Sequence, residues 1–214
     1  MILVFPPLYA IIDSGLLTTS ELALAELLAG SGVELIQYRS KKASSRSLFE
    51  ISRQLSSVLT RRGVRFIVND RPDIAVLSGA GGVHVGQTDL GVEEARAICR
   101  KERWVGVSTH ALDQVAAADL TSADYVAFGP IFPTTTKENP DAVVGTQLLR
   151  QARRLTSKPL VAIGGITCER AAEVYAAGAD SLAVTRDLIC AANPAERARE
   201  YIHIAATVKS GERQ

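Results

Sequence analysis

Short apolar runs alternate with longer segments of helical pattern along the chain. The apolar runs have strand length and predict strands at Leu8–Asp13, Glu34–Arg39, Arg65–Asp70, Gly82–Gly86, Trp104–Thr109, Tyr125–Gly129, Leu160–Gly164 and Ser181–Thr185. The segments between and after them predict helices at Ser20–Ala29, Ser45–Arg62, Pro72–Ser78, Val92–Lys101, Leu112–Asp119, Gly145–Leu155, Glu169–Ala177 and Pro194–Val208. Helix-capping residues support several of these bounds: Thr19 or Ser20, Gly63, Gly178 and Asn193-Pro194.

A strand followed by a helix, repeated eight times within 214 residues, predicts a (β/α)8 barrel that forms one domain over residues 1–214. A doubly wound open sheet is the alternative architecture. It would be favoured by a G-x-G-x-x-G turn after the first strand, where the sequence instead has Asp13-Ser14-Gly15-Leu16-Leu17.

Composition narrows the class of protein. The chain is 47% hydrophobic and 22% charged, which fits one globular domain with a sizeable core. Its formal net charge of +1 argues against binding to nucleic acid or to a membrane surface, so any positive site must be local. The odd, widely spaced cysteines, Cys99, Cys168 and Cys190, indicate free thiols in a reducing compartment. The apolar start has no preceding basic residue and is cut short by Pro6-Pro7, so we expect a cytoplasmic protein.

Polar side chains gather at the ends of the predicted strands. In a barrel these ends lie on one rim, which is where catalytic and binding residues are found. Gln37, Arg39 and Lys41 share one face of the second strand, whereas Ile36 and Tyr38 face outward. Further polar groups stand at the other strand ends: Asn69-Asp70, His84, Gln87, Asp89, Ser108-Thr109-His110, Gly164-Gly165 and Thr185-Arg186.

Each of these groups also has an ordinary structural explanation. Asp89 could cap the following helix, His84 could be an interior histidine with satisfied hydrogen bonds, and Gly164-Gly165 could be a tight turn. What favours a functional interpretation is that strands two to eight would all place such groups on the same rim.

The sixth strand leads into a loop of unusual composition. Gly129-Pro130 begins it, and Thr134, Thr135, Thr136 and Lys137 add three hydroxyls and an amine. Hydroxyls, backbone N–H groups and an ammonium all donate hydrogen bonds, so the loop suits a phosphate or a diphosphate. A polar connector with a solvated lysine is the alternative.

Two carboxylates, Asp70 and Asp89, follow neighbouring strands, which lie about 5 Å apart in a sheet. They could share a hard cation, and Mg2+ fits because it takes one or two carboxylates together with water and phosphate oxygens. Arg39, Lys41 and Lys137 would complete a positive cradle for a departing diphosphate.

A second phosphate site is indicated by Gly164-Gly165 and Thr185-Arg186, because the loops after strands seven and eight often bind phosphate in barrels. Two anion sites imply two phosphorylated substrates, or one substrate with phosphate at both ends. A Ser/His/Asp triad is disfavoured, because no G-x-S-x-G elbow surrounds Ser108 and His110.

Six motifs, in order along the chain, together resemble the thiamine phosphate synthase family. They are Gln37-Tyr38-Arg39-Ser40-Lys41, Val68-Asn69-Asp70, His84-Val85-Gly86-Gln87-Thr88-Asp89-Leu90, Gly106-Val107-Ser108-Thr109-His110, the loop from Gly129 to Lys137, and Ala162-Ile163-Gly164-Gly165-Ile166. The resemblance extends from Leu8 to about Thr185. It implies a Mg2+-dependent transferase that joins 4-amino-2-methyl-5-(diphosphooxymethyl)pyrimidine to thiazole phosphate. The products are thiamine phosphate and diphosphate, and diphosphate leaves before the thiazole nitrogen attacks.

The resemblance also assigns roles to residues. The pyrimidine diphosphate would be held by Gln37, Tyr38, Arg39, Ser40, Lys41, Asn69, Ser108 and Lys137. The thiazole phosphate would be held by Thr134, Thr135, Thr136, Gly165, Thr185 and Arg186. Asp70 and Asp89 would bind the metal, and the catalytic residues would be Ser108, Lys137, Arg39 and Lys41. A homo-oligomer is left open.

Two positions depart from the family's pattern. Ser40 stands where an acidic residue is common, and strand alternation should point it away from the site. Arg186 stands where some members have a small hydroxyl residue, so it would either clamp the phosphate or crowd the pocket.

Two alternative functions share the predicted fold. A related thiazole tautomerase would use a histidine such as His110 for proton transfer, but it would not need the carboxylates and cations of a diphosphate site. A barrel that binds a thiamine intermediate without catalysis is the other alternative.

Overall fold

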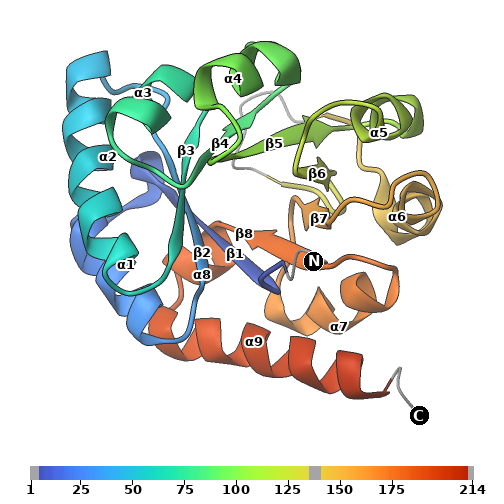
Figure 1. The fold of residues 1–214 in the computed structure, drawn as a ribbon. Coiled ribbons are helices and arrows are strands. Elements are labelled where there is room, and N and C mark those ends of the chain that lie inside the picture. The colour runs from blue at the N-terminus through green and yellow to red at the C-terminus, as the bar shows by residue number, and fades with distance from the viewer. Residues whose placement is uncertain (1–4, 135–140, 212–214) are drawn as a thin grey trace.

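A closed barrel of eight parallel strands, surrounded by helices, forms the molecule in the computed structural model, which describes residues 5–134 and 141–211 (Figure 1). The strands pair in chain order, and the first strand also pairs with the last: Tyr9 is opposite Leu35 on one side and Ala183 on the other. The predicted (β/α)8 barrel is therefore confirmed, and the open sheet is excluded because each of the described strands pairs with two neighbours in a closed ring.

The strands are β1 (Leu8–Asp13), β2 (Leu35–Arg39), β3 (Arg65–Asn69), β4 (Gly82–Val85), β5 (Trp104–Thr109), β6 (Tyr125–Phe128), β7 (Leu160–Ile163) and β8 (Ser181–Val184). The helices are η1 (Ser14–Leu16), α1 (Glu21–Gly30), α2 (Ser45–Thr60), α3 (Pro72–Leu77), α4 (Val92–Cys99), α5 (Leu112–Asp119), α6 (Gly145–Arg153), α7 (Cys168–Ala176), α8 (Arg186–Ile189) and α9 (Pro194–Gly211). Their order along the chain is the predicted one, and most bounds agree within two residues.

Two short helices, η1 and α8, were not expected. The carboxylate of Asp13 caps η1 by accepting a hydrogen bond from the N–H of Gly15 at 2.9 Å. Each helix is too short to show a helical period in the sequence. The predicted caps elsewhere are present: Ser20 accepts from the N–H of Ala23 at 3.2 Å, and Asn193 accepts from the N–H of Glu196 at 3.2 Å.

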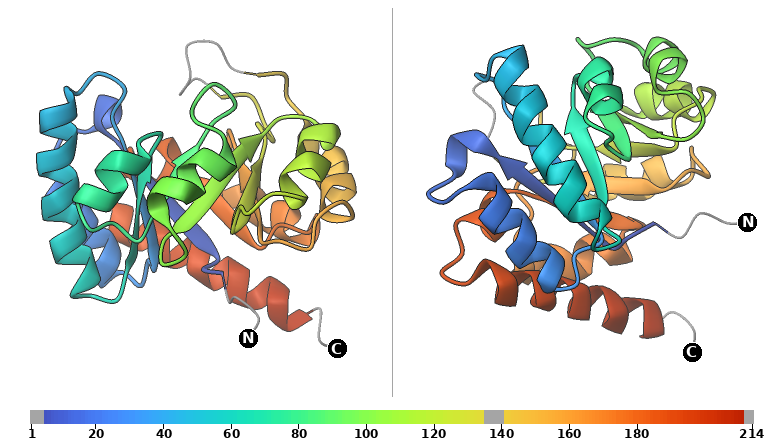
Figure 2. Two further views of the ribbon diagram at one scale, coloured as in Figure 1. Left: turned by 45° about the horizontal axis from the view of Figure 1, so that its top comes forward. Right: turned by 60° about the vertical axis from the view of Figure 1, so that its left-hand side comes forward.

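Alternation along each strand divides the apolar side chains between two cores. On β1, Leu8 and Ile12 face the surrounding helices, whereas Tyr9 and Ile11 face the barrel interior. The outer core lies between the sheet and its helices, which surround the barrel in both views of Figure 2. The inner core is smaller and consists of Phe5, Tyr9, Ile11, Leu35, Ile67, Tyr125, Ala127, Val161 and Ala183.

Aromatic rings fill the part of the barrel nearest the amino ends of the strands. Phe5 stacks on Trp104 with ring centroids 5.2 Å apart, and it lies 5.0 Å from the ring of Tyr125. Gly106 on β5 makes room for that tyrosine, because a Cβ at this position would lie 2.0 Å from a ring atom of Tyr125. The interior therefore accepts a large ring on β6 only because the neighbouring strand has no side chain there.

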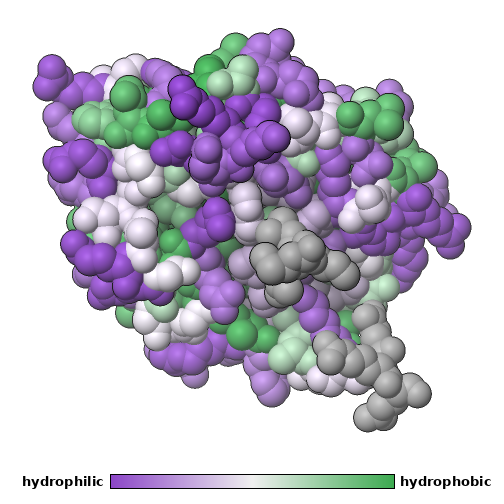
Figure 3. Space-filling model, viewed as in Figure 1, coloured by the Kyte–Doolittle hydropathy of each residue, from purple (hydrophilic) through white to green (hydrophobic). Residues whose placement is uncertain are grey.

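Hydrophilic residues cover most of the surface visible in Figure 3, and hydrophobic residues occur there in small groups. Among the described residues, no helix is long and apolar enough to cross a membrane. Cys99 and Cys168 are buried, Cys190 is exposed, and all three carry free thiols.

We predict that Gly106→Ala lowers the free energy of unfolding by about 3 kcal/mol, because the new methyl group overlaps the ring of Tyr125 and overpacks the inner core. Urea unfolding followed by circular dichroism would measure the change. Gly30→Ala is the matched control: no heavy atom lies within 4 Å of its Cβ position, at the end of α1, so its stability should stay within about 1 kcal/mol of wild type. Equal unfolding midpoints for the two variants would contradict the close packing of Tyr125 against Gly106.

Candidate active site

A cavity of about 680 Å3 opens at the carboxyl ends of the strands, where a barrel of this type places its chemistry. Every strand contributes to its wall. From β1 to β8 the lining residues include Tyr9, Ile11, Asp13, Gln37, Arg39, Asn69, His84, Ser108, Ala127, Ile163 and Ala183. The loops that follow the strands add His110, Gly129, Pro130, Pro133, Thr134, Asp141, Gly164, Gly165 and Thr185.

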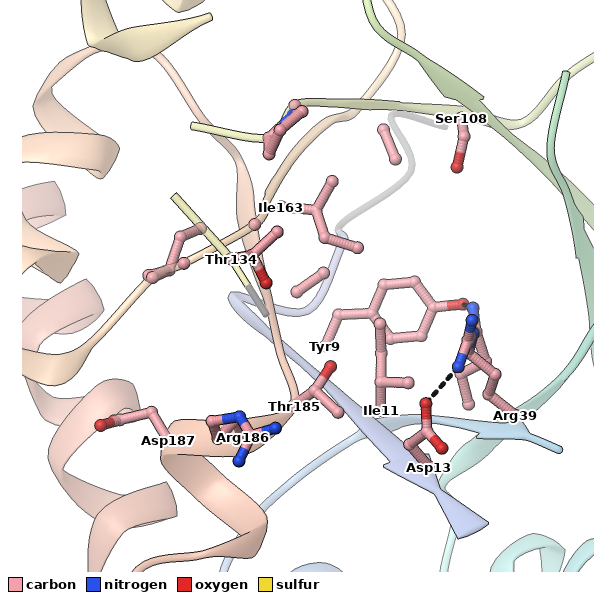
Figure 4. A pocket seen from close by; sticks show the side chains of 18 of the residues that line it. Tyr9, Ile11, Asp13, Arg39, Ser108, Thr134, Ile163, Thr185, Arg186 and Asp187 are labelled. Atoms are coloured by element: carbon pink, nitrogen blue, oxygen red, sulfur yellow. Dashed lines mark hydrogen bonds and ion pairs between the residues drawn. The ribbon is translucent and has the colours of Figure 1, made fainter. Parts of the chain in front are cut away.

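Many of the predicted binding residues meet in this one cavity, although they are distributed over the whole chain. Those that line it are Gln37, Arg39, Asn69, Ser108, Thr134, Gly165, Thr185 and Arg186. Figure 4 shows Arg186 on one side of β1 and Arg39 on the other. Arg186, which the sequence left either as a phosphate clamp or as a residue that crowds the pocket, thus belongs to the cavity wall.

Three of the described residues predicted to bind substrate do not line the cavity: Tyr38, Ser40 and Lys41, the last of which lies at the rim. Tyr38 is 1% exposed and packs in the outer core, where its hydroxyl donates a hydrogen bond to Glu21 Oε1 at 3.3 Å. Ser40 accepts a hydrogen bond from Ser14 Oγ at 2.7 Å, beyond the end of β2. Strand alternation turns the side chains of Tyr38 and Ser40 away from the interior, so the geometry does not support a substrate contact by either one.

The remaining loop residues of the prediction, Thr135, Thr136 and Lys137, lie outside the described residues. Their roles stay predictions. The described start of the loop, however, is held firmly against the turn after β7. The N–H groups of Ile131 and Phe132 donate to the carbonyl oxygens of Ile163 and Gly164 at 2.9 and 3.0 Å.

Glycine is required where these two turns meet. A Cβ on Gly165 would lie 2.4 Å from the carbonyl oxygen of Pro133, and the residue has a positive φ of 63°. The guanidinium of Arg170 on α7 lies 4.5 Å from the ring centroid of Phe132 and adds a cation–π contact between that helix and the loop after β6. Thr134 consequently reaches the cavity wall from an anchored loop.

Arg39 is held by a carboxylate that the sequence did not identify as functional. Asp13 is adjacent to it in the register of β1 and β2, is 6% exposed, and forms an ion pair with the guanidinium (Figure 4). The signal was present in the alternation of Tyr9, Ile11 and Asp13 along one face of the strand. The effect of the pair is to fix the direction of a cation that lines the cavity.

A chain of hydrogen bonds, buried except at its Ser108 end, runs beneath the cavity, and we call it the floor chain. Gln37 Nε2 lies 2.7 Å from the hydroxyl of Tyr9, which lies 2.9 Å from the hydroxyl of Tyr125. The hydroxyl of Tyr125 lies 3.1 Å from His84 Nδ1, and His84 Nε2 lies 2.8 Å from Ser108 Oγ. Burial raises the pKa of both tyrosines above the ordinary value, so both keep their protons. Tyr9 and Tyr125 were not recognised from the sequence.

The two predicted metal carboxylates lie near the rim, together with Lys41. The Lys41 ammonium forms an ion pair with Asp70, whose backbone has a positive φ of 63°. Burial raises the pKa of Asp70; the hydrogen bond from Lys41 opposes this rise, and the nearby carboxyl of Asp89 adds to it. Asp89 itself accepts a hydrogen bond from the N–H of Gly86 at 2.8 Å.

These carboxylates fit a divalent cation in two respects. The carboxyl of Asp89 adds to the cost of ionising Asp70, and a cation beside Asp70 would lower that cost. No group of three or more histidine, cysteine or acidic side chains able to hold a metal occurs within residues 5–134 and 141–211. The donor set is therefore incomplete without ligands from water or substrate, which is the usual situation for Mg2+.

His110 lies on the cavity wall beside the turn after β6. Its Nδ1 lies 2.6 Å from the carbonyl oxygen of Gly129 and donates to it, since a carbonyl can only accept. The other ring nitrogen, Nε2, lies 3.5 Å from Asp141 Oδ2. The ring is thus oriented by the loop that follows β6.

Comparison with known proteins agrees with the motifs in the sequence. The model of the family described as thiamine monophosphate synthase matches residues 8–188. The chain is 48% identical over 206 residues to the thiamine-phosphate synthase of Koribacter versatilis, an alignment that covers 93% of this chain and 95% of that protein. It is 40% identical to the thiamine-phosphate synthase of Methanocella arvoryzae, covering 97% of this chain and 98% of that one.

A solved structure of similar shape is the thiamine phosphate pyrophosphorylase from Pyrococcus furiosus. It superposes with a TM-score of 0.86 at 31% sequence identity, over 94% of this chain and 96% of that one. The similarity extends over nearly the whole barrel and includes every strand that lines the cavity. The chain belongs to the thiamine monophosphate synthase family.

Proposed function

We infer that the protein is a thiamine-phosphate synthase, which joins 4-amino-2-methyl-5-(diphosphooxymethyl)pyrimidine to thiazole phosphate and releases diphosphate. The observation that carries this inference is a single cavity with a cation on either side of β1, Arg39 and Arg186. Two phosphorylated partners can bind there with their charged ends apart and their uncharged rings together. The family relationship supplies the identity of the two partners.

The pyrimidine diphosphate is assigned to the side formed by β2, β3 and β5. Arg39, oriented by Asp13, can donate two parallel hydrogen bonds to phosphate oxygens. Asn69 and Ser108 offer further donors from the cavity wall. Lys41 at the rim, and Lys137 by resemblance to the family, would add positive charge where the diphosphate departs.

The thiazole phosphate is assigned to the other side of β1. Thr134, Thr185 and Arg186 line the cavity there, and Gly165 allows a phosphate to approach the backbone closely because it has no side chain. Thr135 and Thr136 would extend this site by resemblance to the family. Arg186 then clamps the phosphate, since its position in the wall leaves the cavity open.

We assign Mg2+ to Asp70 and Asp89, because a cation would offset the raised cost of ionising Asp70. When bound, the ion supplies Lewis-acid stabilisation of the charge that develops on the departing diphosphate.

The chain's own contribution is orientation and electrostatic stabilisation, and no covalent nucleophile is required. Arg39 and Ser108 stabilise the leaving diphosphate with hydrogen bonds while its C–O bond breaks. Apolar side chains in the wall, among them Ile11 and Ile163, exclude water from the pyrimidine methylene cation that remains. The thiazole nitrogen, held in place by its phosphate, then attacks that carbon.

A thiazole tautomerase is the second candidate, and the observation that favours it is His110, an oriented histidine on the cavity wall. Such an enzyme would transfer protons within one substrate. It would have no use for Asp70, Asp89 or the ion pair that orients Arg39.

The direct test is product formation. With Mg2+ and both phosphorylated substrates, the purified protein should release diphosphate and form thiamine phosphate, as measured by a coupled phosphate assay and by chromatography. Protein without Mg2+, in the presence of EDTA, is the control. No product above background would refute the synthase assignment, and isomerisation of a thiazole carboxylate phosphate alone would establish the tautomerase instead.

The metal assignment predicts that Asp70→Asn and Asp89→Asn each lower kcat by about a hundredfold, because the leaving diphosphate loses charge stabilisation. Circular dichroism should show an intact fold. The matched control is Asp73→Asn: Asp73 accepts hydrogen bonds from Arg71 at 2.8 and 2.6 Å, away from the cavity wall, and its variant should keep the Mg2+ dependence of wild type. An unchanged Mg2+ titration in both site variants would show that the ligands are other residues.

The division of the cavity predicts opposite effects for its two arginines. Arg39→Gln should raise KM for the pyrimidine diphosphate about tenfold and leave KM for the thiazole phosphate unchanged, whereas Arg186→Gln should do the reverse, since each loses a charged hydrogen bond to one substrate only. Steady-state kinetics with each substrate varied in turn would measure both. Arg46→Gln, whose side chain is 87% exposed on α2, is the control for lost charge alone. A rise in the same KM for both site variants would contradict the division.

A further inference from the structure

We propose that His84 is a positioning residue, held by the floor chain with its ring proton on Nε2, and that it directs the hydroxyl proton of Ser108 into the cavity. The proposal rests on the proposed function, because it explains how Ser108 is oriented to bind the pyrimidine diphosphate. His84 lies on β4, is 6% exposed, and has ring nitrogens close to two other members of the floor chain.

The floor chain links residues that lie on five different strands. It runs from Gln37 on β2 to Tyr9 on β1, then across the interior to Tyr125 on β6, His84 on β4 and Ser108 on β5. Its four separations lie between 2.7 and 3.1 Å, which is the range of good hydrogen bonds. The two end members of the floor chain, Gln37 and Ser108, are both assigned to the pyrimidine diphosphate. The floor chain therefore connects these two substrate contacts through hydrogen bonds.

The donor and acceptor atoms of the floor chain determine the direction in which its hydrogen bonds donate, beginning at Gln37. The amide nitrogen Nε2 carries only donor hydrogens, so it donates to the oxygen of Tyr9. Tyr9 is 1% exposed, and its own O–H needs an acceptor. The hydroxyl oxygen of Tyr125 is at 2.9 Å and fills that role.

From Tyr125 the floor chain continues through His84 to Ser108. Tyr125 is fully buried and already accepts from Tyr9, so its proton is donated to His84 Nδ1 at 3.1 Å. A ring nitrogen that accepts carries no proton, and the imidazole proton therefore lies on Nε2. From there it is donated to Ser108 Oγ at 2.8 Å.

The reverse direction has a cost. If His84 donated from Nδ1 to Tyr125, then Tyr125 would donate to Tyr9, whose oxygen would receive two hydrogen bonds. The O–H of Tyr9 would be left buried without an acceptor, and such a loss is expensive. Because burial raises the pKa of both phenols, deprotonation does not relieve this arrangement.

The direction of the chain determines what Ser108 offers to a substrate. Its oxygen accepts from His84, so its own O–H is the group that can donate into the cavity, and Figure 4 shows the hydroxyl directed there. The backbone is fixed as well, because Gln87 Nε2 donates to the carbonyl oxygen of Ser108 at 2.6 Å. A departing diphosphate has only acceptor oxygens facing such a donor, so the oriented proton matches the charge that develops.

The primary test is a measurement of the histidine tautomer by 15N NMR, using protein labelled on the ring nitrogens of its 3 histidines. His84→Gln assigns the His84 signals by their disappearance. In wild type we expect the proton of His84 on Nε2. In Tyr125→Phe, which removes the donor to Nδ1, we expect a mixture of both tautomers and a kcat about tenfold lower, with KM for the thiazole phosphate unchanged.

Tyr175→Phe is the matched control. It also deletes one buried phenolic hydroxyl, which donates to the carbonyl oxygen of Pro7 at 2.9 Å and is not part of the floor chain. Both the His84 signals and kcat should stay as in wild type. Rescue gives a second readout: His84→Gln keeps an amide that can donate to Ser108, so it should retain about tenfold more kcat than His84→Leu.

Several outcomes would overturn the proposal. These are a proton on Nδ1 in wild type, His84 signals that Tyr125→Phe does not change, or equal kcat for His84→Gln and His84→Leu when circular dichroism shows both to be folded. Failure of the proposed function is distinguishable. If wild type formed no thiamine phosphate, the synthase assignment would fail, whereas the NMR spectrum would still decide which way the floor chain donates.

Discussion

Closure of the sheet is the constraint on which the other features depend. Because β1 is hydrogen-bonded to both β2 and β8, each strand has two partners, and its side chains alternate between the helix layer and a narrow interior. That interior holds few large groups. The ring of Tyr125 occupies space that a side chain at Gly106 would need, and aromatic rings fill the amino end. The carboxyl end is thereby left for a cavity lined from every strand.

Between the aromatic rings and the cavity lies a polar layer, the floor chain, whose members are hydrogen-bonded to one another and, apart from the half-buried Ser108, are buried. Such a layer is stable only when every donor finds an acceptor, since an unpaired polar group in a medium of low polarity is costly. This requirement determines the direction in which the hydrogen bonds of the floor chain donate. It also makes the floor of the cavity a rigid support for the side chains that line it, in place of a solvated surface.

Because the formal net charge of the chain is only +1, the positive charge of the site comes from individual cations, two of which are each placed beside a carboxylate. Arg39 is balanced by Asp13, and Lys41 by Asp70, so the cations are held in place before any anionic substrate arrives. Such preorganisation removes the cost of reorienting the groups during reaction. The family relationship and the cations in the cavity wall are the basis of the proposed chemistry, in which two phosphorylated molecules would meet over the floor chain.

The sequence by itself determined the order of strands and helices, the class of barrel, and the rim on which Arg39, Ser108 and Arg186 would lie. These follow from periodicity and strand direction, which are local properties of the chain. Only the tertiary structure decided which side chains touch. Tyr9 and Tyr125 are 116 residues apart and meet because the closed barrel brings β1 and β6 across a narrow interior. Likewise, Asp13 pairs with Arg39 through strand register. Contacts of this kind depend on closure and register, and neither is encoded in any short segment of sequence.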